Sequence, residues 1–131
     1  PMSKNKELIK KLVACFNEKN EKGIAEIVTD KVKHTAAGTA FAADVEGKNA
    51  FMAYIKDDVL SKFHRINFDP YNIFEDPEKG IVAAEWKGEF DLKNGNSFSS
   101  NGIFVIDIKE GKIDWVRDYF DTEKTKQATS K

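Results

Sequence analysis

The sequence has only one cysteine, which excludes two common ways of stabilising a small domain. Cys15 alone cannot form an internal disulfide, and no second thiolate stands at the spacing of a metal site. Because Cys15 falls within an amphipathic helical pattern, we interpret it as a core residue and not as a reactive thiol. The 131 residues, 40% hydrophobic and 33% charged, are instead typical of one folded domain with its own core.

Long apolar runs and an excess of one charge are also missing. No stretch approaches the roughly 20 apolar residues that cross a bilayer, and none has the pattern of a secretory signal. We therefore expect a cytoplasmic protein with no membrane partner. The 21 basic and 22 acidic residues nearly balance, and the basic ones form no stripe, so nucleic acid is not an expected partner.

Motifs for cofactors and for nucleophilic catalysis are absent as well. The sequence contains no GxGxxG or GxxxxGK[ST] string to cradle a phosphate, and no GxSxG elbow. No group of His, Cys and Glu has the spacing of a zinc or iron site, so we expect no metal. Any catalysis is therefore expected to be acid–base chemistry inside a pocket, without a cofactor.

Phenylalanine, by contrast, is plentiful, with ten residues against two methionines. So many rings can fill a core and also line an apolar cavity. In the first half of the chain, apolar residues recur at the spacing of helices over 3–16, 24–30 and 47–60, and 32–36 is typical of a short strand. We interpret 37–46 as a plain connection, with a flap over a pocket as the alternative.

From residue 63 onward the apolar period is two. Turn signals, including an Asn-Gly pair, separate four predicted strands over 63–75, 81–92, 97–108 and 113–121. Three helices followed by such a meander favour an α+β fold with helices on one face of an antiparallel sheet. We expect residues 3–122 to form this single domain and 123–131 to form a polar, frayed tail.

Apolar residues occur on both faces of these predicted strands. In the strand over 97–108, Ile103 and Val105 oppose Phe104 and Ile106. A sheet that is apolar on both sides needs both sides covered, and three helices of one chain cannot do so. We therefore expect a homodimer formed through the sheet, with twofold symmetry as the commonest arrangement.

The last predicted strand carries the most specific pattern, EGKIDWVRDYFD at 110–121. Together with the order of elements, it resembles the nuclear-transport-factor-like superfamily, and within it the SnoaL-like polyketide cyclases and limonene epoxide hydrolases. The resemblance implies a cone-shaped, curved sheet of the SnoaL-like (cystatin-like) fold, wrapped with the three helices around an apolar pocket. It also implies that Asp118 stands where the epoxide hydrolases have an aspartate that acts on a lytic water.

Strand alternation predicts which side chains surround Asp118. It shares one side of the strand with Val116 and Phe120, and a carboxyl group between apolar neighbours has its pKa raised by desolvation. A raised pKa suits a general acid or base near neutral pH. The alternative is a structural carboxylate that binds backbone groups or an arginine.

Two further residues are candidates to assist Asp118. His34, beside the small-residue connection, could face Asp118 across the cavity as an acid–base partner, or it could be a half-exposed strand histidine. Glu85 could be a second acid, or a solvated residue on the exposed face of its strand. Ketosteroid isomerases share this fold and use a pocket tyrosine as an oxyanion donor, for which the candidates here are Tyr54, Tyr71 and Tyr119.

The resulting functional hypothesis is a cofactor-independent isomerase, cyclase or hydrolase that acts on a small apolar ligand through Asp118. The alternative is a non-catalytic, dimeric module that binds such a ligand. Polar groups that converge on Asp118 would favour chemistry, and a lone carboxylate would favour binding. The apolar wall of the pocket is expected to contain Phe16, Phe51, Tyr54, Val116 and Phe120.

Overall fold

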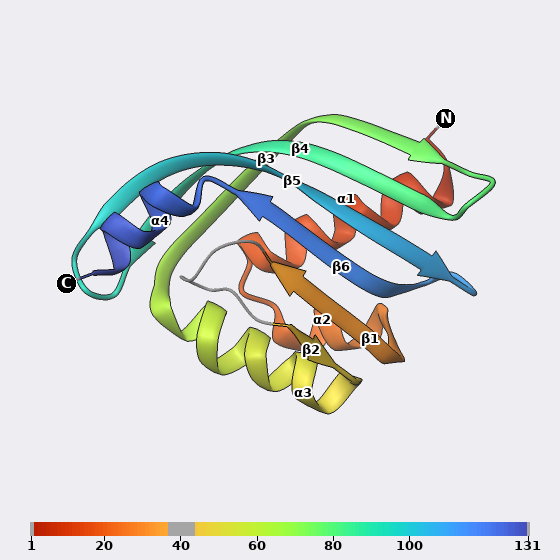
Figure 1. The fold of residues 1–131 in the computed structure, drawn as a ribbon, viewed down its shortest axis with the longest axis horizontal. Helices are drawn as coiled ribbons and strands as arrows, with labels where there is room; N and C mark the ends of the chain where they lie inside the picture. Colours follow the sequence, from red (N-terminus) through yellow and green to blue (C-terminus); the bar gives the residue numbers. More distant parts are fainter. Residues whose placement is uncertain (1, 37–43, 131) are drawn as a thin grey trace.

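The computed structural model describes residues 2–36 and 44–130 of the chain. The first half of the described chain contains three α-helices and two strands, and four more strands follow (Figure 1). In chain order the elements are α1 (Lys4–Asn17), α2 (Glu21–Glu26), β1 (Val28–Ala36), β2 (Val45–Glu46), α3 (Lys48–Ala53), η1 (Tyr54–Val59), η2 (Leu60–Lys62), β3 (Phe63–Asp76), β4 (Ile81–Leu92), β5 (Ser97–Lys109), β6 (Lys112–Phe120) and α4 (Thr122–Thr129).

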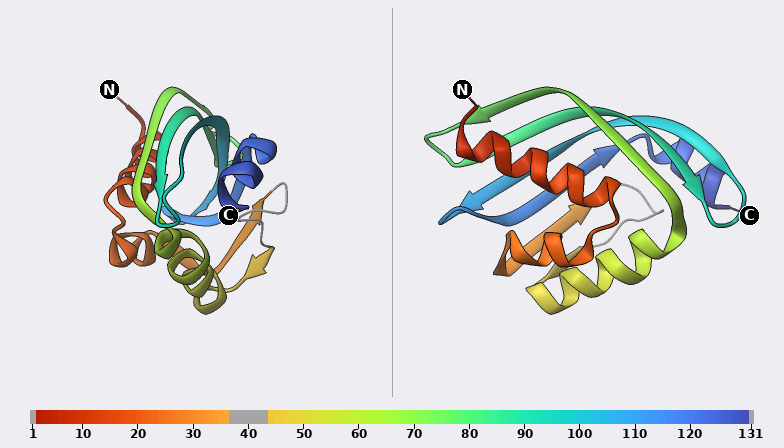
Figure 2. Two further views of the ribbon diagram at one scale, coloured as in Figure 1. Left: turned by 90° about the vertical axis from the view of Figure 1, so that its left-hand side faces the viewer. Right: turned by 180° about the vertical axis from the view of Figure 1, so that it is seen from behind.

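The strands form one six-stranded sheet in the order β2-β1-β6-β5-β4-β3. Strands β3 to β6 are an antiparallel meander, β1 joins β6 in parallel, and β2 pairs antiparallel with β1. Figure 2 shows the sheet curling around the interior of the molecule, with α1 and α3 across its concave side. The expected α+β fold with a curved sheet and helices is confirmed.

The concave side holds the hydrophobic core. Helix α1 begins after Ser3, whose side-chain oxygen accepts a hydrogen bond from the Lys6 backbone N–H at 3.1 Å and so caps the first turn. Its inner face packs against β3 and β4 through residues at helical spacing, and these are Ile9, Leu12, Val13 and Phe16.

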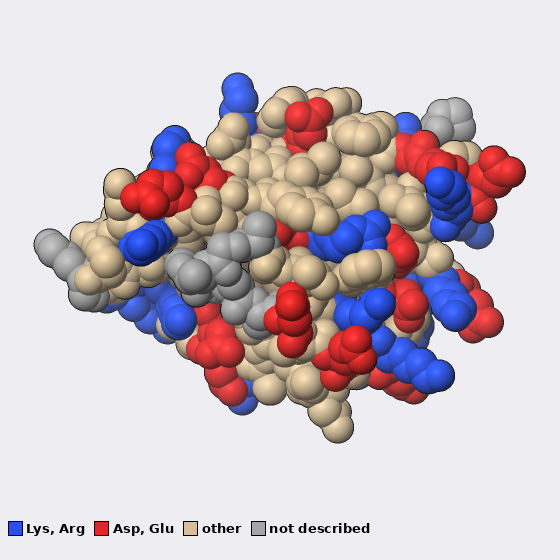
Figure 3. Space-filling model, viewed as in Figure 1, with Lys and Arg blue, Asp and Glu red and all other residues tan. Residues whose placement is uncertain are grey.

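The convex side of the sheet is only partly covered. Three large hydrophobic residues on it are unusually exposed, since Tyr71, Phe74 and Tyr119 keep 56%, 47% and 45% of their surface accessible. The register places Phe74 opposite Ala83, which is on the same outer face. Figure 3, which views this face, shows uncharged atoms over much of it.

Two sequence expectations about element boundaries are wrong. The second helix ends at Glu26, because the chain from Val28 onward pairs with β6, so β1 is longer than the expected strand over 32–36. The frayed tail expected at 123–131 is instead helix α4 up to Thr129. The Asp121 side chain caps this helix, and the backbone carbonyl of its buried Ala128 accepts hydrogen bonds from the side chains of Asn94 and Asn96.

The connection expected at 37–46 is described only from residue 44 onward. Val45–Glu46 form the short edge strand β2 beside β1. The flap alternative rests on residues 37–43, which lie outside the described residues.

Candidate active site

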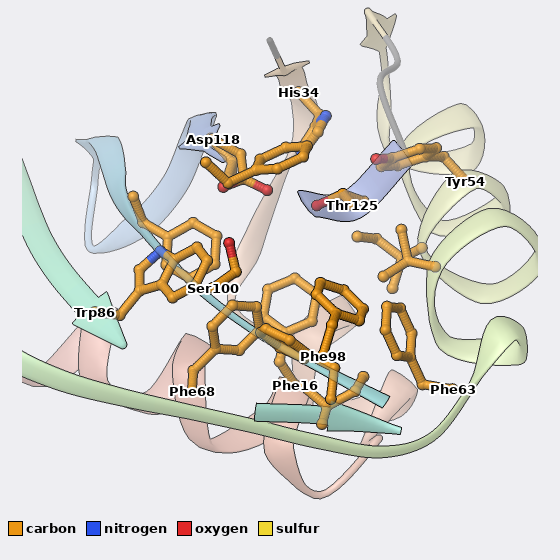
Figure 4. A pocket seen from close by; sticks show the side chains of 17 residues that line it. Phe16, His34, Tyr54, Phe63, Phe68, Trp86, Phe98, Ser100, Asp118 and Thr125 are labelled. Atoms are coloured by element: carbon orange, nitrogen blue, oxygen red, sulfur yellow. The ribbon is translucent and has the colours of Figure 1, made fainter. Parts of the chain in front are cut away.

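A pocket opens into the concave side of the sheet. Its cavity has a volume of about 70 Å³ and is lined mainly by aromatic and aliphatic side chains (Figure 4). The lining residues come from α1, β1, η1, the four long strands and α4, and they are Phe16, His34, Tyr54, Ile55, Val59, Phe63, Ile66, Phe68, Trp86, Phe90, Phe98, Ser100, Phe104, Val116, Asp118, Phe120 and Thr125.

Asp118 lies where strand alternation predicts it. Val116 and Phe120 line the pocket beside it, whereas Arg117 points to the convex side and forms an ion pair with Asp107 at 2.7 Å. Arg117 also stacks on Trp115, with 4.3 Å between its guanidinium carbon and the ring centroid. The arginine next to Asp118 in sequence is therefore engaged on the opposite face of the sheet.

The carboxyl group of Asp118 is shielded from water. Its Oδ1 atom is buried and has no hydrogen-bond partner among residues 2–36 and 44–130, although the residue as a whole is only partly buried. Burial raises the pKa of Asp118 from its ordinary value of 3.8 to about 7. The predicted direction of the pKa shift and its predicted cause are both confirmed.

His34 reaches the same pocket from β1. The parallel register pairs His34 with Val116 and Ala36 with Asp118, so His34 and Asp118 are diagonal neighbours on adjacent strands. His34 is only 4% exposed, and the half-exposed alternative is therefore wrong. Its ring lies against Tyr54, with 4.8 Å between the ring centroids.

Tyr54 begins the segment η1, in which the helix that starts with α3 widens into π turns. Such turns are often found at functional sites, and here the segment presents Tyr54, Ile55 and Val59 to the pocket. Burial, and then the negative charge of Asp118, raise the pKa of the Tyr54 hydroxyl well above its usual range. Tyr54 therefore stays protonated at neutral pH.

Two residues expected at the site lie outside the pocket lining. Glu85 is on the convex face, where the Asn72 amide donates a hydrogen bond to it at 2.7 Å and the Tyr71 hydroxyl donates one at 3.4 Å. Since alternate residues of β4 face opposite sides, its neighbour Trp86 faces the pocket. Phe51 is completely buried and packs beside His34, with 6.3 Å between the ring centroids.

The sequence analysis missed three polar residues of the pocket. Trp86 and Ser100 come from neighbouring strands β4 and β5, and Thr125 comes from α4, where a frayed tail was expected. The alternation of Trp86, Gly88 and Phe90 along β4 was the available signal for Trp86. No comparable signal existed for Thr125, since its burial depends on the docking of α4.

The amino-acid sequence matches a known domain family, in agreement with the fold and the pocket described above. Residues 9–116 match the family model of the SnoaL-like domain. The chain belongs to the SnoaL-like domain family. The expected superfamily is therefore confirmed.

Known proteins similar to this SnoaL-like chain include two from Bacillus subtilis. The uncharacterised protein YesE is 26% identical over 125 residues, which cover 93% of this chain and 84% of YesE. A crystal structure described as a putative isomerase is 25% identical, with a TM-score of 0.86 over 97% of this chain and 93% of that one. A Mycobacterium tuberculosis protein in complex with estradiol-17beta-hemisuccinate is similar in fold alone, at 16% identity and a TM-score of 0.80, over 94% of this chain and 98% of that one.

The part of the chain that the structure describes holds no group of three or more His, Cys, Asp or Glu side chains arranged to hold a metal ion. In that same part, no helix is both long and apolar enough to span a bilayer. The residues that line the pocket include a carboxyl group, an imidazole and a protonated phenol, which belong to Asp118, His34 and Tyr54.

Proposed function

We propose that this protein is a cofactor-independent isomerase, cyclase or hydrolase that acts on a small apolar ligand through Asp118. The observation that carries the proposal is a carboxyl group with a pKa of about 7 in a pocket lined mainly by apolar side chains. Near neutral pH such a group is populated in both its charged and its neutral form. It can therefore take a proton from a bound ligand or water and later return it.

His34 and Tyr54 would take part by binding the ligand. Both side chains line the pocket, and Tyr54 keeps its proton, so its hydroxyl can donate a hydrogen bond to a ligand oxygen. Glu85 is not part of the proposed mechanism, because its hydrogen bonds hold it on the convex face. The relatives support a role in small-molecule chemistry, since one is described as a putative isomerase and another binds a steroid ester.

The size of the pocket limits how a ligand enters. A cavity of about 70 Å³ has room for a few water molecules, whereas an engineered cavity that binds benzene has about 150 Å³. A ring-containing ligand therefore requires the lining side chains to move apart. The face of the pocket formed by η1 and α4 is the expected place of this movement, because these short helical segments are less tied to the sheet than the strands are to one another.

The proposal is tested with two small probes that separate the reaction types. Acetophenone in D₂O reports proton transfer at carbon through deuterium exchange of its methyl group, and styrene oxide reports hydrolysis. We expect the wild type to act on at least one probe, Asp118→Asn to lose that activity, and Glu85→Gln to keep it. Turnover of neither probe by the wild type, or full activity in Asp118→Asn, would favour the non-catalytic binding module instead.

We also propose that the convex face of the sheet forms a homodimer. The exposed rings of Tyr71, Phe74 and Tyr119 support this arrangement, since they stand on the face of the sheet that the helices of the same chain leave open (Figure 3). Sedimentation velocity measures the mass in solution, and a monomer at all concentrations would contradict the proposal.

A further inference from the structure

Three residues that line the pocket each carry a buried polar atom without a hydrogen-bond partner in the described part of the chain. Trp86 Nε1, Ser100 Oγ and Asp118 Oδ1 are each shielded from solvent and have no hydrogen-bond partner within the described ranges 2–36 and 44–130. All three residues line the same cavity. Buried polar atoms are normally paired, because an unpaired one loses its hydrogen bonds with water and gains nothing in return. Three such atoms around one cavity indicate that a ligand or bound water supplies their hydrogen-bond partners.

The sheet register places the three residues on the same face of three neighbouring strands. Trp86 on β4 pairs with Gly102 on β5, and Gly102 pairs in turn with Phe120 on β6. Ser100 lies two residues before Gly102 along β5, and Asp118 pairs with Phe104, two residues after Gly102. All three side chains therefore face the concave side, with the Trp86–Gly102 pair between Ser100 and Asp118. In Figure 4 the side chains of Trp86, Ser100 and Asp118 gather at one end of the pocket.

The direction of the Trp86 N–H is fixed by close packing. The indole lies over Gly102, where an added Cβ atom would stand only 2.6 Å from Trp86 Cζ2. The ring of Phe68 meets it edge-on, with 4.7 Å between the centroids, and the ring of Phe104 lies at 5.8 Å. The indole therefore cannot rotate toward another acceptor, and its N–H is preorganised for ligand binding.

We propose that Trp86 and Ser100 form a two-donor subsite for a carbonyl oxygen of the ligand. An indole N–H can only donate, so the ligand atom that meets it must be an acceptor. A carbonyl oxygen has two lone pairs and matches the two donors. The inference rests on the proposed function, because it places this oxygen beside the atom on which Asp118 acts, and it narrows the ligands to carbonyl compounds.

A matched pair of probes tests the subsite by binding alone. Acetophenone and α-methylstyrene have nearly the same shape and differ in a C=O group against a C=CH₂ group. The chain has two tryptophans, and the Trp115 indole already donates to Thr35 Oγ1 at 3.1 Å on the convex face, so its NMR signal is an internal reference. We expect acetophenone to shift the Trp86 indole N–H signal downfield and α-methylstyrene to leave it near its free position. Equal shifts with both probes, or binding of neither, would overturn the subsite.

Matched serine variants separate a binding role from a structural one. One hydrogen bond is worth a factor of about 2 to 13 in affinity, so Ser100→Ala should weaken acetophenone binding by that factor and leave α-methylstyrene binding unchanged. Ser99→Ala, at the exposed neighbouring position, should change neither. Equal weakening of both probes in Ser100→Ala would show a packing defect and contradict the subsite.

The outcomes also separate this inference from the proposed function. Loss of the carbonyl preference in Ser100→Ala, together with unchanged turnover in Asp118→Asn, would leave the subsite standing and remove the catalytic role of Asp118. The reverse result, with no carbonyl preference but loss of turnover in Asp118→Asn, would remove the subsite alone.

Discussion

The raised pKa of Asp118 predicts that the protein becomes less stable as the pH rises. In the unfolded chain this carboxyl group loses its proton near pH 3.8, whereas the folded protein holds the proton up to about pH 7. The stability that this proton supplies is complete below the lower value, declines above it, and is lost once the pH passes the higher value. A pKa difference of this size corresponds to roughly 4 kcal/mol in the free energy of unfolding.

Urea unfolding at two pH values measures this effect. Between about pH 5 and pH 8, the Asp118 contribution should fall by roughly 2–3 kcal/mol, because part of the change already occurs below pH 5. Asp118→Asn removes the titrating group, so its stability should lack this decline. Glu85→Gln is the matched control, a carboxyl-to-amide change on the convex face that should keep the wild-type decline. If the wild type and Asp118→Asn changed in parallel, the buried carboxyl would not have the raised pKa.

Three further predictions concern the docking of α4, the packing of Trp86 on Gly102 and the convex face of the sheet. Replacing both Asn94 and Asn96 by Ala removes two hydrogen bonds to α4 and should cost about 1–3 kcal/mol in urea unfolding, and unchanged stability would show that α4 does not depend on them. Gly102→Ala places a methyl group against the Tyr119 carbonyl oxygen and against Trp86, and should cost about 1–3 kcal/mol by overpacking; a gain in stability would contradict the observed packing. Phe74→Glu should convert the proposed dimer to a monomer in sedimentation velocity, and an unchanged mass would place the interface elsewhere.

Local patterns in the sequence were enough to predict the side of β6 on which Asp118 lies. A period of two and a Val116–Asp118–Phe120 alternation fix which residues share a face, and the apolar neighbours fix the direction of the pKa shift. The resemblance of the 110–121 segment to a known family then implied the curved fold around a pocket.

Other features of the site depend on contacts that no local pattern encodes. His34 comes beside Asp118 only because β1 pairs in parallel with a strand far along the chain. Neighbouring residues of a strand face opposite sides, so only one of Glu85 and Trp86 can line the pocket. The sequence did not show which one does, because β4 has apolar residues on both faces. Thr125 enters the pocket because α4 docks against the β4–β5 hairpin, which the polar composition of the tail did not reveal.

The central claim, a carboxyl group poised near neutral pH inside an apolar pocket, has one direct test. The carboxyl carbon of Asp118 can be followed by ¹³C NMR in protein labelled at aspartate, with Asp118→Asn to assign its signal. A titration midpoint at about pH 7 is the predicted result. A midpoint near the ordinary value of 3.8 would contradict the account of Asp118 as an acid–base group.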